Sequence, residues 1–270
     1  MPKLLTEDQV AQFKRDGYLF PVTALDADEA RACADRVARY ESETGKSAAK
    51  SLSFKAHVPF AMFSELVRHP RILDAVEDLL GPNVVCWGSS FFSKPAHSPK
   101  YISWHADTYY YGLEPPDTVT VWVAFTPSNR ASGCIRVIPG SHLNDTSFEQ
   151  APSEHNMLGR GQTTQDVDES AAVYMPLEPG QFSMHHERLV HSSEPNGADY
   201  RRIGYSIHYC PTHVSQARFA GDGQRPSAAL VRGVDETGHW EHETMTTADF
   251  DPAAWKWAEE QRRRFLSRAR

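Results

Sequence analysis

The first eighty residues combine amphipathic helical patterns with short turns. Residues 6–15 and 26–41 each begin with a threonine or aspartate followed three positions later by Gln or Glu, which is the capping-box pattern of a helix start. A third helix is predicted over 70–80, where proline opens the segment and Gly-Pro follows it. Residues 18–22 are typical of a short strand, and the small and polar residues 42–56 indicate a loop that crosses towards a site.

Beyond residue 82 the pattern changes to short β-branched and aromatic runs bounded by Pro, Gly, Asn or Ser. The predicted strands cover residues 84–87, 90–93, 118–125, 134–138, 172–175, 181–184 and 203–209. Many short strands without long helices between them favour a sandwich or jelly roll over alternating βαβ units. The fold class predicted for this chain is therefore α+β with a mainly β core.

Two segments lack any regular pattern. Residues 143–170 are acidic and irregular, and a loop of this length inside a compact domain indicates an active-site lid. Residues 211–250 are also irregular, and a last helix is predicted over 251–267. We expect one domain spanning residues 1–270, with no role assigned to residues 211–270.

Composition narrows the class of function. The chain has 270 residues and a formal net charge of -7, which argues against a general nucleic-acid binder because phosphate binding needs a clustered positive field. No apolar run approaches the length of a membrane span, and no signal-peptide pattern opens the chain. Its four cysteines are scattered and read as reduced thiols, so a cytoplasmic protein acting on a small molecule is expected.

The candidate chemistry begins with His105, Asp107 and His191. Two imidazoles and one carboxylate are the ligands of a facial-triad Fe(II) site, which leaves three coordination positions open. Side chains at i and i+2 of an extended segment point the same way, so one metal can contact both members of the H-x-D pair. An isolated H-x-D pattern is weak evidence, and it is the later histidine in a strand-like context that makes a metal site the favoured interpretation.

Other histidines near the distal ligand compete with it. His185 and His186 lie in the same segment, but adjacent strand residues face opposite sides of a sheet. His186 is a candidate for the pocket wall, although a surface position fits the pattern equally well. His142 closes a Pro-Gly-Ser-His turn and is interpreted as structural.

Several segments carry a family resemblance. They are residues 5–18, 104–108, 121–126, 132–136, 137–142 and 191–196. They resemble the phytanoyl-CoA dioxygenase family, whose members are Fe(II)- and 2-oxoglutarate-dependent oxygenases with a double-stranded β-helix core. The resemblance runs from residue 5 to about residue 210. It implies a jelly-roll, cupin-like core flanked by N-terminal helices and a C-terminal helix.

The resemblance also implies which residues hold 2-oxoglutarate. The family's arginine follows the distal histidine by eleven residues, which selects Arg202 over Arg201 as the partner of the far carboxylate. Ser193 matches a serine that donates to the same carboxylate. Trp122 matches a position beside the cosubstrate, although core packing is its default interpretation. Lys55 matches less well, and a solvated lysine is the alternative.

Tyr109, Tyr111 and His186 are the predicted substrate contacts. The first two follow the metal-binding turn, where alternation places some tyrosines in the core and others at the substrate. The acidic lid favours an amine-bearing or neutral substrate over a CoA ester. The substrate itself stays open among amino acids, osmolytes, aminophosphonates, acyl thioesters and natural-product intermediates.

The function predicted from the sequence is hydroxylation of an unactivated C–H bond with Fe(II), 2-oxoglutarate and O2, releasing succinate and CO2. An aliphatic halogenase of the same superfamily is one alternative, but halogenation needs a small residue where this chain has Asp107. A cupin-like sensor with structural zinc is another, since zinc accepts the same ligands. That alternative does not explain Arg202.

Overall fold

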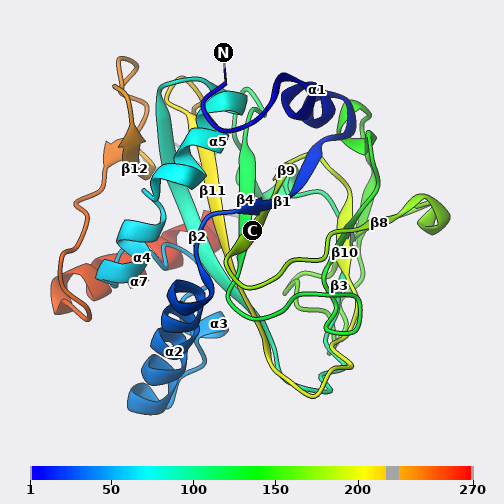
Figure 1. The fold of residues 1–270 in the computed structure, drawn as a ribbon. Coiled ribbons are helices and arrows are strands. Elements are labelled where there is room, and N and C mark those ends of the chain that lie inside the picture. Colours follow the sequence, from blue (N-terminus) through cyan, green and yellow to red (C-terminus); the bar gives the residue numbers. More distant parts are fainter. Residues whose placement is uncertain (1, 217–224, 269–270) are drawn as a thin grey trace.

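The computed structural model describes residues 2–216 and 225–268, which form two β-sheets with helices against one of them (Figure 1). The α-helices are α1 (Glu7–Asp16), α2 (Ala27–Thr44), α3 (Ala48–Ser51), α4 (Ala61–Leu66), α5 (Pro70–Leu80), α6 (Thr108–Tyr111) and α7 (Pro252–Arg268). The 3-10 helices are η1 (Ser141–Leu143) and η2 (Glu169–Ala171).

Thirteen strands are described in these two ranges, and most belong to the two main sheets. They are β1 (Tyr18–Thr23), β2 (Val84–Lys94), β3 (Ile102–His105), β4 (Val119–Ala124), β5 (Ile135–Val137), β6 (Phe148–Gln150), β7 (Gln162–Thr164), β8 (Val173–Tyr174), β9 (Gln181–His186), β10 (His191–Ser193), β11 (Arg202–Pro211), β12 (Ser227–Arg232) and β13 (Glu241–His242). The larger sheet has the order β1-β9-β4-β11-β2-β12-β13 and the smaller sheet β3-β10-β5-β8, while β6 and β7 pair separately. This confirms the predicted mainly β, jelly-roll class.

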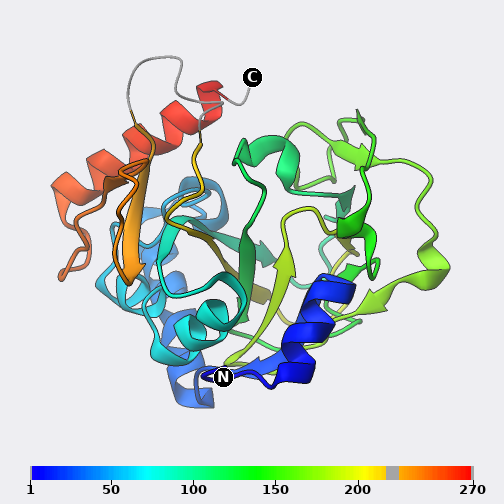
Figure 2. The ribbon, with the colours of Figure 1, turned by 90° about the horizontal axis from the view of Figure 1, so that it is seen from above.

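Helices cover the outer face of the larger sheet, as Figure 2 shows from above. Alternate residues of β11, from Ile203 to Tyr209, enter the same hydrophobic core as Phe63 of α4 and Val76 of α5. The residues between them on β11 point the other way, towards the smaller sheet. The strand therefore has a packed helical side and a side that is free to build a cavity.

The first two helices begin where the sequence predicts them. Thr6 and Asp26 each accept a hydrogen bond from the backbone N–H three residues on, and the Gln or Glu at that position bonds back, which completes both capping boxes. Gly17 ends α1 in the left-handed conformation that glycine adopts at little cost.

Three regions differ from the sequence prediction. The two strands predicted over 84–93 are the single strand β2, which stays paired with β11 through Gly88. The loop predicted over 42–56 contains the end of α2 and all of α3. Strand β12 lies in the stretch predicted to be irregular and extends the larger sheet beside β2.

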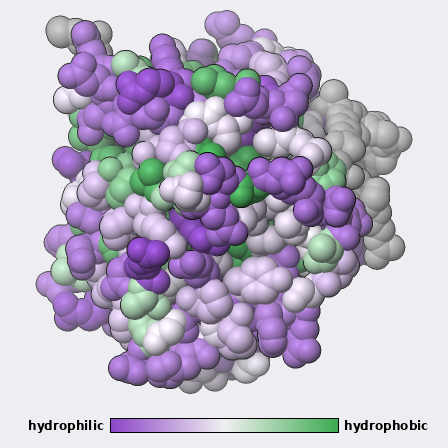
Figure 3. Space-filling view, turned by 90° about the vertical axis from the view of Figure 1, so that its right-hand side faces the viewer, coloured by the Kyte–Doolittle hydropathy of each residue, from purple (hydrophilic) through white to green (hydrophobic). Residues whose placement is uncertain are grey.

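Figure 3 shows the face that carries the smaller sheet and the 143–170 segment. Hydrophilic residues dominate this face, with small apolar areas between them. No described helix combines the length and the apolar character that a membrane span requires.

Candidate metal and cosubstrate site

The three predicted metal ligands meet at the edge of the smaller sheet. His105 ends β3 and His191 begins β10, and these two residues lie directly opposite each other in the antiparallel pair. Asp107 follows β3 at the start of α6, where its backbone N–H donates to the Glu187 carbonyl over 2.8 Å. One ligand atom from each of the three residues lies within 4.8 Å of the other two.

Backbone carbonyls fix which nitrogen of each histidine faces the site. Nδ1 of His105 donates to the Ser103 carbonyl and Nδ1 of His191 to the Leu189 carbonyl, each over 2.9 Å. Because a carbonyl only accepts, both Nε2 atoms carry a free lone pair, and they lie 3.4 and 4.0 Å from Oδ1 of Asp107. Such second contacts orient metal-binding histidines in proteins.

The charge state also suits a cation. Burial alone would raise the pKa of Asp107, but His191, His105 and His185 outweigh it and hold that pKa well below its usual value. Burial, together with His105, lowers the pKa of His191 well below 6.5. The site therefore offers the Asp107 carboxylate and the neutral imidazole of His191, and with His105 this is the donor set of a divalent transition metal.

A cavity of about 230 Å³ lies between the two sheets and includes all three ligands in its wall. Arg202 on β11 lines it and is 1% exposed, and burial lowers its pKa to about 10. Its Nη1 donates to the Gly133 carbonyl over 2.6 Å, whereas its buried Nε has no described partner. An unpaired, buried guanidinium nitrogen is costly unless a ligand occupies the site.

The neighbouring arginine points to the opposite side of the sheet. Arg201 forms a two-pronged ion pair with Glu41 of α2, at 2.6 and 2.9 Å, and donates to Ser93. Of this arginine pair, the structure thus brings Arg202 to the cavity and ties Arg201 to a helix.

Two glycines make room for the cavity wall around Arg202. A side chain on Gly204 would lie 1.8 Å from the Trp122 ring, so only glycine lets this indole lie flat across β11. The indole then lies 5.2 Å from the Arg202 guanidinium. Gly133, with φ +68°, approaches the Glu194 carbonyl too closely for any side chain, and its own carbonyl receives Arg202.

Ser193 lines the cavity beside Arg202, and the structure adds a residue that the sequence analysis missed. Lys94 is fully buried and donates to the hydroxyl of Ser193 over 2.7 Å, to its carbonyl and to the carbonyl of Glu194. Burial and the Arg202 charge lower the pKa of Lys94 to about 6. Lys94 pairs with Arg202 across β2 and β11, a register that no local sequence pattern reveals.

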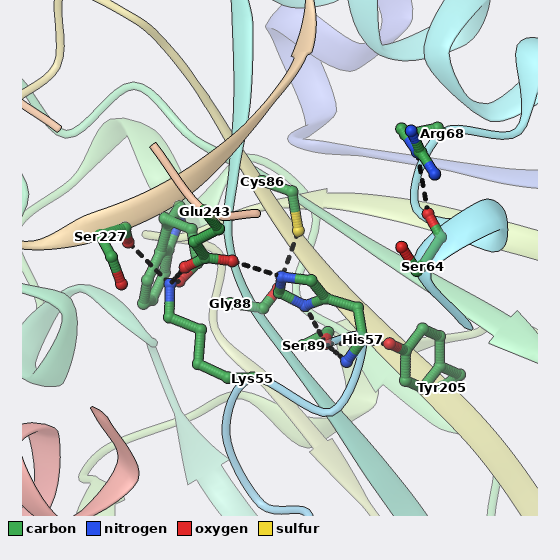
Figure 4. Close-up of polar contacts among 11 residues, drawn as sticks. Lys55, His57, Ser64, Arg68, Cys86, Gly88, Ser89, Tyr205, Ser227 and Glu243 are labelled. Carbon is green, nitrogen blue, oxygen red and sulfur yellow. Dashed lines mark hydrogen bonds and ion pairs between the residues drawn. The ribbon is translucent and has the colours of Figure 1, made fainter. Parts of the chain in front are cut away.

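The prediction that Lys55 reaches the cosubstrate needs correction. The Lys55 ammonium donates to the carbonyls of Trp87 and Ser227, each over 2.7 Å, and to the carboxylate of Glu243 (Figure 4). Lys55 is absent from the described wall of the cavity. Glu243 lies in the C-terminal segment to which the sequence analysis assigned no role, so its ion pair with Lys55 was not predicted.

The prediction for His186 is also corrected. His186 faces away from the cavity and lies beside His142, with ring centroids 5.3 Å apart. His185 faces the cavity instead, with Nε2 3.7 Å from Oδ2 of Asp107, and neither of its ring nitrogens has a described hydrogen-bond partner within 3.5 Å. Alternation separated the two histidines correctly but did not say which one faces inwards.

Of the predicted substrate tyrosines, Tyr111 lines the cavity and the side chain of Tyr109 lies outside the described residues. The Tyr111 hydroxyl lies 3.1 Å from Nδ1 of His208, and Thr120 contacts the same nitrogen. The segment 143–170 contributes Leu158 and Gln162 to the cavity wall.

Comparison with known proteins agrees with this geometry. Residues 13–204 match the family model described as phytanoyl-CoA dioxygenase (PhyH). The chain is 28% identical over 182 residues to a probable phytanoyl-CoA dioxygenase of Caenorhabditis elegans, with 64% of this chain and 58% of the relative covered. It is 29% identical over 196 residues to the ectoine dioxygenase of Bordetella parapertussis, with 66% and 63% covered. This chain spans 50–58% of the length of the curated phytanoyl-CoA dioxygenases that it matches in Caenorhabditis elegans, Bos taurus and Homo sapiens.

Solved structures resemble the chain over nearly its whole length. The non-heme monooxygenase ThoJ, in its apo form, superposes with a TM-score of 0.83 at 34% identity, covering 97% of both chains. CytC3 with Fe(II) and alpha-ketoglutarate gives a TM-score of 0.69 at 26% identity, covering 91% of this chain and 95% of CytC3.

Proposed function

This chain belongs to the phytanoyl-CoA dioxygenase family, and we propose that it is an Fe(II)- and 2-oxoglutarate-dependent dioxygenase that hydroxylates a C–H bond of a small molecule. The observation that carries the proposal is the cluster of His105, Asp107 and His191 in the same cavity as the buried Arg202. A metal site alone fits many functions, but a metal site beside a buried cation fits a chelating dicarboxylate.

In this proposal the three clustered side chains hold Fe(II) through two Nε2 atoms and the Asp107 carboxylate. When bound, iron with 2-oxoglutarate and O2 supplies C–H hydroxylation coupled to release of succinate and CO2. The protein contributes orientation, because the Ser103 and Leu189 carbonyls hold both imidazoles in the binding tautomer. The two facing sheets would exclude water from the cavity between them.

The far carboxylate of 2-oxoglutarate is proposed to bind at Arg202. The unpartnered Nε of Arg202 and the Ser193 hydroxyl are the proposed donors to this carboxylate, and Lys94 donates to the Ser193 hydroxyl. The buried Arg202 guanidinium has no described carboxylate partner, so the carboxylate of the cosubstrate would pair with it and favour the charged form of the neighbouring Lys94. Trp122 would pack against the carbon chain of the cosubstrate.

The alternatives from the sequence fit less well. A halogenase would need a vacant coordination position, but the Asp107 carboxylate belongs to the ligand cluster. A zinc sensor would leave the buried Arg202 unexplained.

We further propose that residues 143–170 close over the bound substrate. Leu158 and Gln162 reach the cavity wall from this segment, and β6 and β7 pair with each other within it. Limited proteolysis within the segment should slow when 2-oxoglutarate and a substrate are bound. Unchanged cleavage would remove the lid role.

The proposed substrate is a small molecule and the proposed compartment is the cytoplasm. All four cysteines are buried and free, as expected of a chain folded under reducing conditions.

The direct test compares two histidines of neighbouring segments. His191→Ala should abolish Fe(II) binding and 2-oxoglutarate turnover, whereas His186→Ala, which faces the other side of the sheet, should retain both. The measurements are anaerobic Fe(II) titration and the weak visible absorption band of the Fe(II)·2-oxoglutarate complex. Near-normal binding in His191→Ala would refute the metal assignment.

A further inference from the structure

The cavity has a second end, about 20 Å along β11 from Arg202 at about 3.3 Å per residue, where His208 lies. Aromatic rings form its wall. The Trp87 ring lies 4.5 Å from Tyr111, edge to face, and Phe54 stacks on Phe265 of α7 at 4.4 Å. Phe54 and Trp87, 6.3 Å apart, join the two pairs into one surface that lines the cavity.

One polar ring interrupts this aromatic wall. Nδ1 of His208 lies 3.1 Å from both the Tyr111 and the Thr120 hydroxyls, so that nitrogen is fully engaged. Nε2 of His208 has no described partner and is not fully buried, and the ring lines the cavity. This nitrogen therefore faces the cavity. Burial lowers the pKa of His208 to about 4, so the ring is neutral at physiological pH.

The ionic groups behind the wall neutralise one another (Figure 4). Lys55 adopts the left-handed conformation, with φ 57°. Phe54 lines the cavity, whereas the Lys55 ammonium points to Glu243. Glu243 also accepts from Nε2 of His57 over 2.8 Å. The ion pair is satisfied internally and offers no charge to a ligand.

Among the described residues of the cavity wall, the only carboxylate and guanidinium belong to Asp107 and Arg202, which the proposed metal and cosubstrate already use. We infer that the second end binds an uncharged, planar ring-bearing part of the substrate, which packs on Trp87 and makes one hydrogen bond to Nε2 of His208. A charged group there would lose its hydration without gaining an ionic partner. The inference rests on the proposed function and names the substrate class for it.

This wall depends on residues beyond the family match, which ends at residue 204. His208, Glu243 and Phe265 all lie past that point. Phe54, Trp87 and Tyr111 of the same wall lie within the match, so the C-terminal segment completes a surface that the matched region begins.

The experiment uses bicyclic probes that differ in one property at a time. Naphthalene, indole, coumarin, naphthalene-2-sulfonate and N-methylquinolinium are titrated calorimetrically onto the anaerobic Fe(II)·2-oxoglutarate enzyme. Indole or coumarin should bind about tenfold more tightly than naphthalene, as one hydrogen bond predicts. The sulfonate and the quinolinium should each bind at least about thirtyfold more weakly than the better neutral probe.

Variants test whether His208 forms the hydrogen bond to the probe. His208→Phe should remove the preference for indole or coumarin over naphthalene, and His208→Gln should restore part of it. His142→Phe, a change at a buried histidine outside this cavity, should leave the preference intact. Retained preference in His208→Phe, equal binding of a charged probe, or no binding of any neutral probe would each overturn the inference.

The same measurements distinguish failure of the proposed function from failure of the substrate inference. If the Fe(II)·2-oxoglutarate absorption band does not form, the proposed function fails before any probe is added. If the band forms in the parent protein and in both His208 variants, but the parent protein shows no preference among the probes, only the substrate inference fails.

Discussion

Two lysines of this protein are buried to the same degree but in different electrostatic settings. Lys55 and Lys94 each donate to three oxygen atoms and are at most 1% exposed. A carboxylate, Glu243, balances Lys55. Lys94 donates only to carbonyl and hydroxyl oxygens, and the Glu194 carboxylate only partly offsets the effect of burial and of the Arg202 cation on its pKa. We interpret the lysine that is paired with a carboxylate within the fold as structural, and the lysine beside the unpaired Arg202 as part of the proposed site for an anionic ligand.

The pKa values follow the same division. Although burial raises the pKa of Glu243, Lys55 and His57 hold it at about 2, so this carboxylate stays ionised over the physiological range. The pKa of Lys94 falls to about 6, because burial and Arg202 both disfavour its charged form.

The largest expected effect lies on the structural side of the comparison. Lys55→Met leaves the Glu243 carboxylate buried without its main partner, and such losses cost roughly 3–5 kcal/mol of unfolding free energy. Urea denaturation should show this decrease, while 2-oxoglutarate affinity, measured in folded protein, should stay within about twofold. Combining Lys55→Met with Glu243→Leu should recover most of the stability, and no recovery would mean that the ion pair is not the cause.

Arg202→Ala tests the ligand side of the comparison. Loss of a charge-assisted contact should cost roughly 2–4 kcal/mol, or about thirty- to a thousandfold in 2-oxoglutarate affinity, with Fe(II) binding largely intact. Arg201→Ala is the matched control, because it removes an ion pair with Glu41 on the opposite face. If the Arg201 variant shows the larger loss of affinity, Arg202 is not the anchor.

Lys94→Met should have a smaller effect of the same kind. It removes the group that holds Ser193 and one positive charge, so 2-oxoglutarate should bind about five- to thirtyfold more weakly. The readout is the dissociation constant from titration of the Fe(II)·2-oxoglutarate absorption band, with the Lys55→Met protein as the control. Equal losses in both lysine variants would abolish the distinction between the two sites.

The smallest expected effect is the uptake of at most about one proton when 2-oxoglutarate binds. With a pKa of about 6, Lys94 is mostly neutral at pH 7.5, and a bound carboxylate raises that pKa. Binding of 2-oxoglutarate should therefore take up as much as about one proton, and affinity should fall as the pH rises above about 6. Calorimetry in buffers of different ionisation enthalpy measures this uptake. Lys94→Met should abolish it, and buffer-independent enthalpies in the parent protein would contradict the charged state of bound Lys94.

Much of the fold was predictable because its signals are local. Capping boxes at Thr6 and Asp26 fixed two helix starts, and the branched and aromatic runs after residue 82 indicated the strands. Strand β12 was missed because its six residues show no clean alternation, and its partner β2 lies more than 130 positions earlier in the chain. The metal cluster was predictable because H-x-D spacing and the later His191 are visible in the sequence.

The sequence by itself determined residue types, helix starts and the alternation that puts adjacent strand residues on opposite faces. Alternation placed Arg201 and Arg202, and likewise His185 and His186, on opposite faces. It did not show which member of each pair faces inwards. Only the tertiary structure decided that, since pairing between distant strands sets the inward face. It also decided the partners of Lys55 and Lys94. Whether a buried charge is balanced depends on what folds against it, and Glu243 reaches Lys55 from 188 residues away.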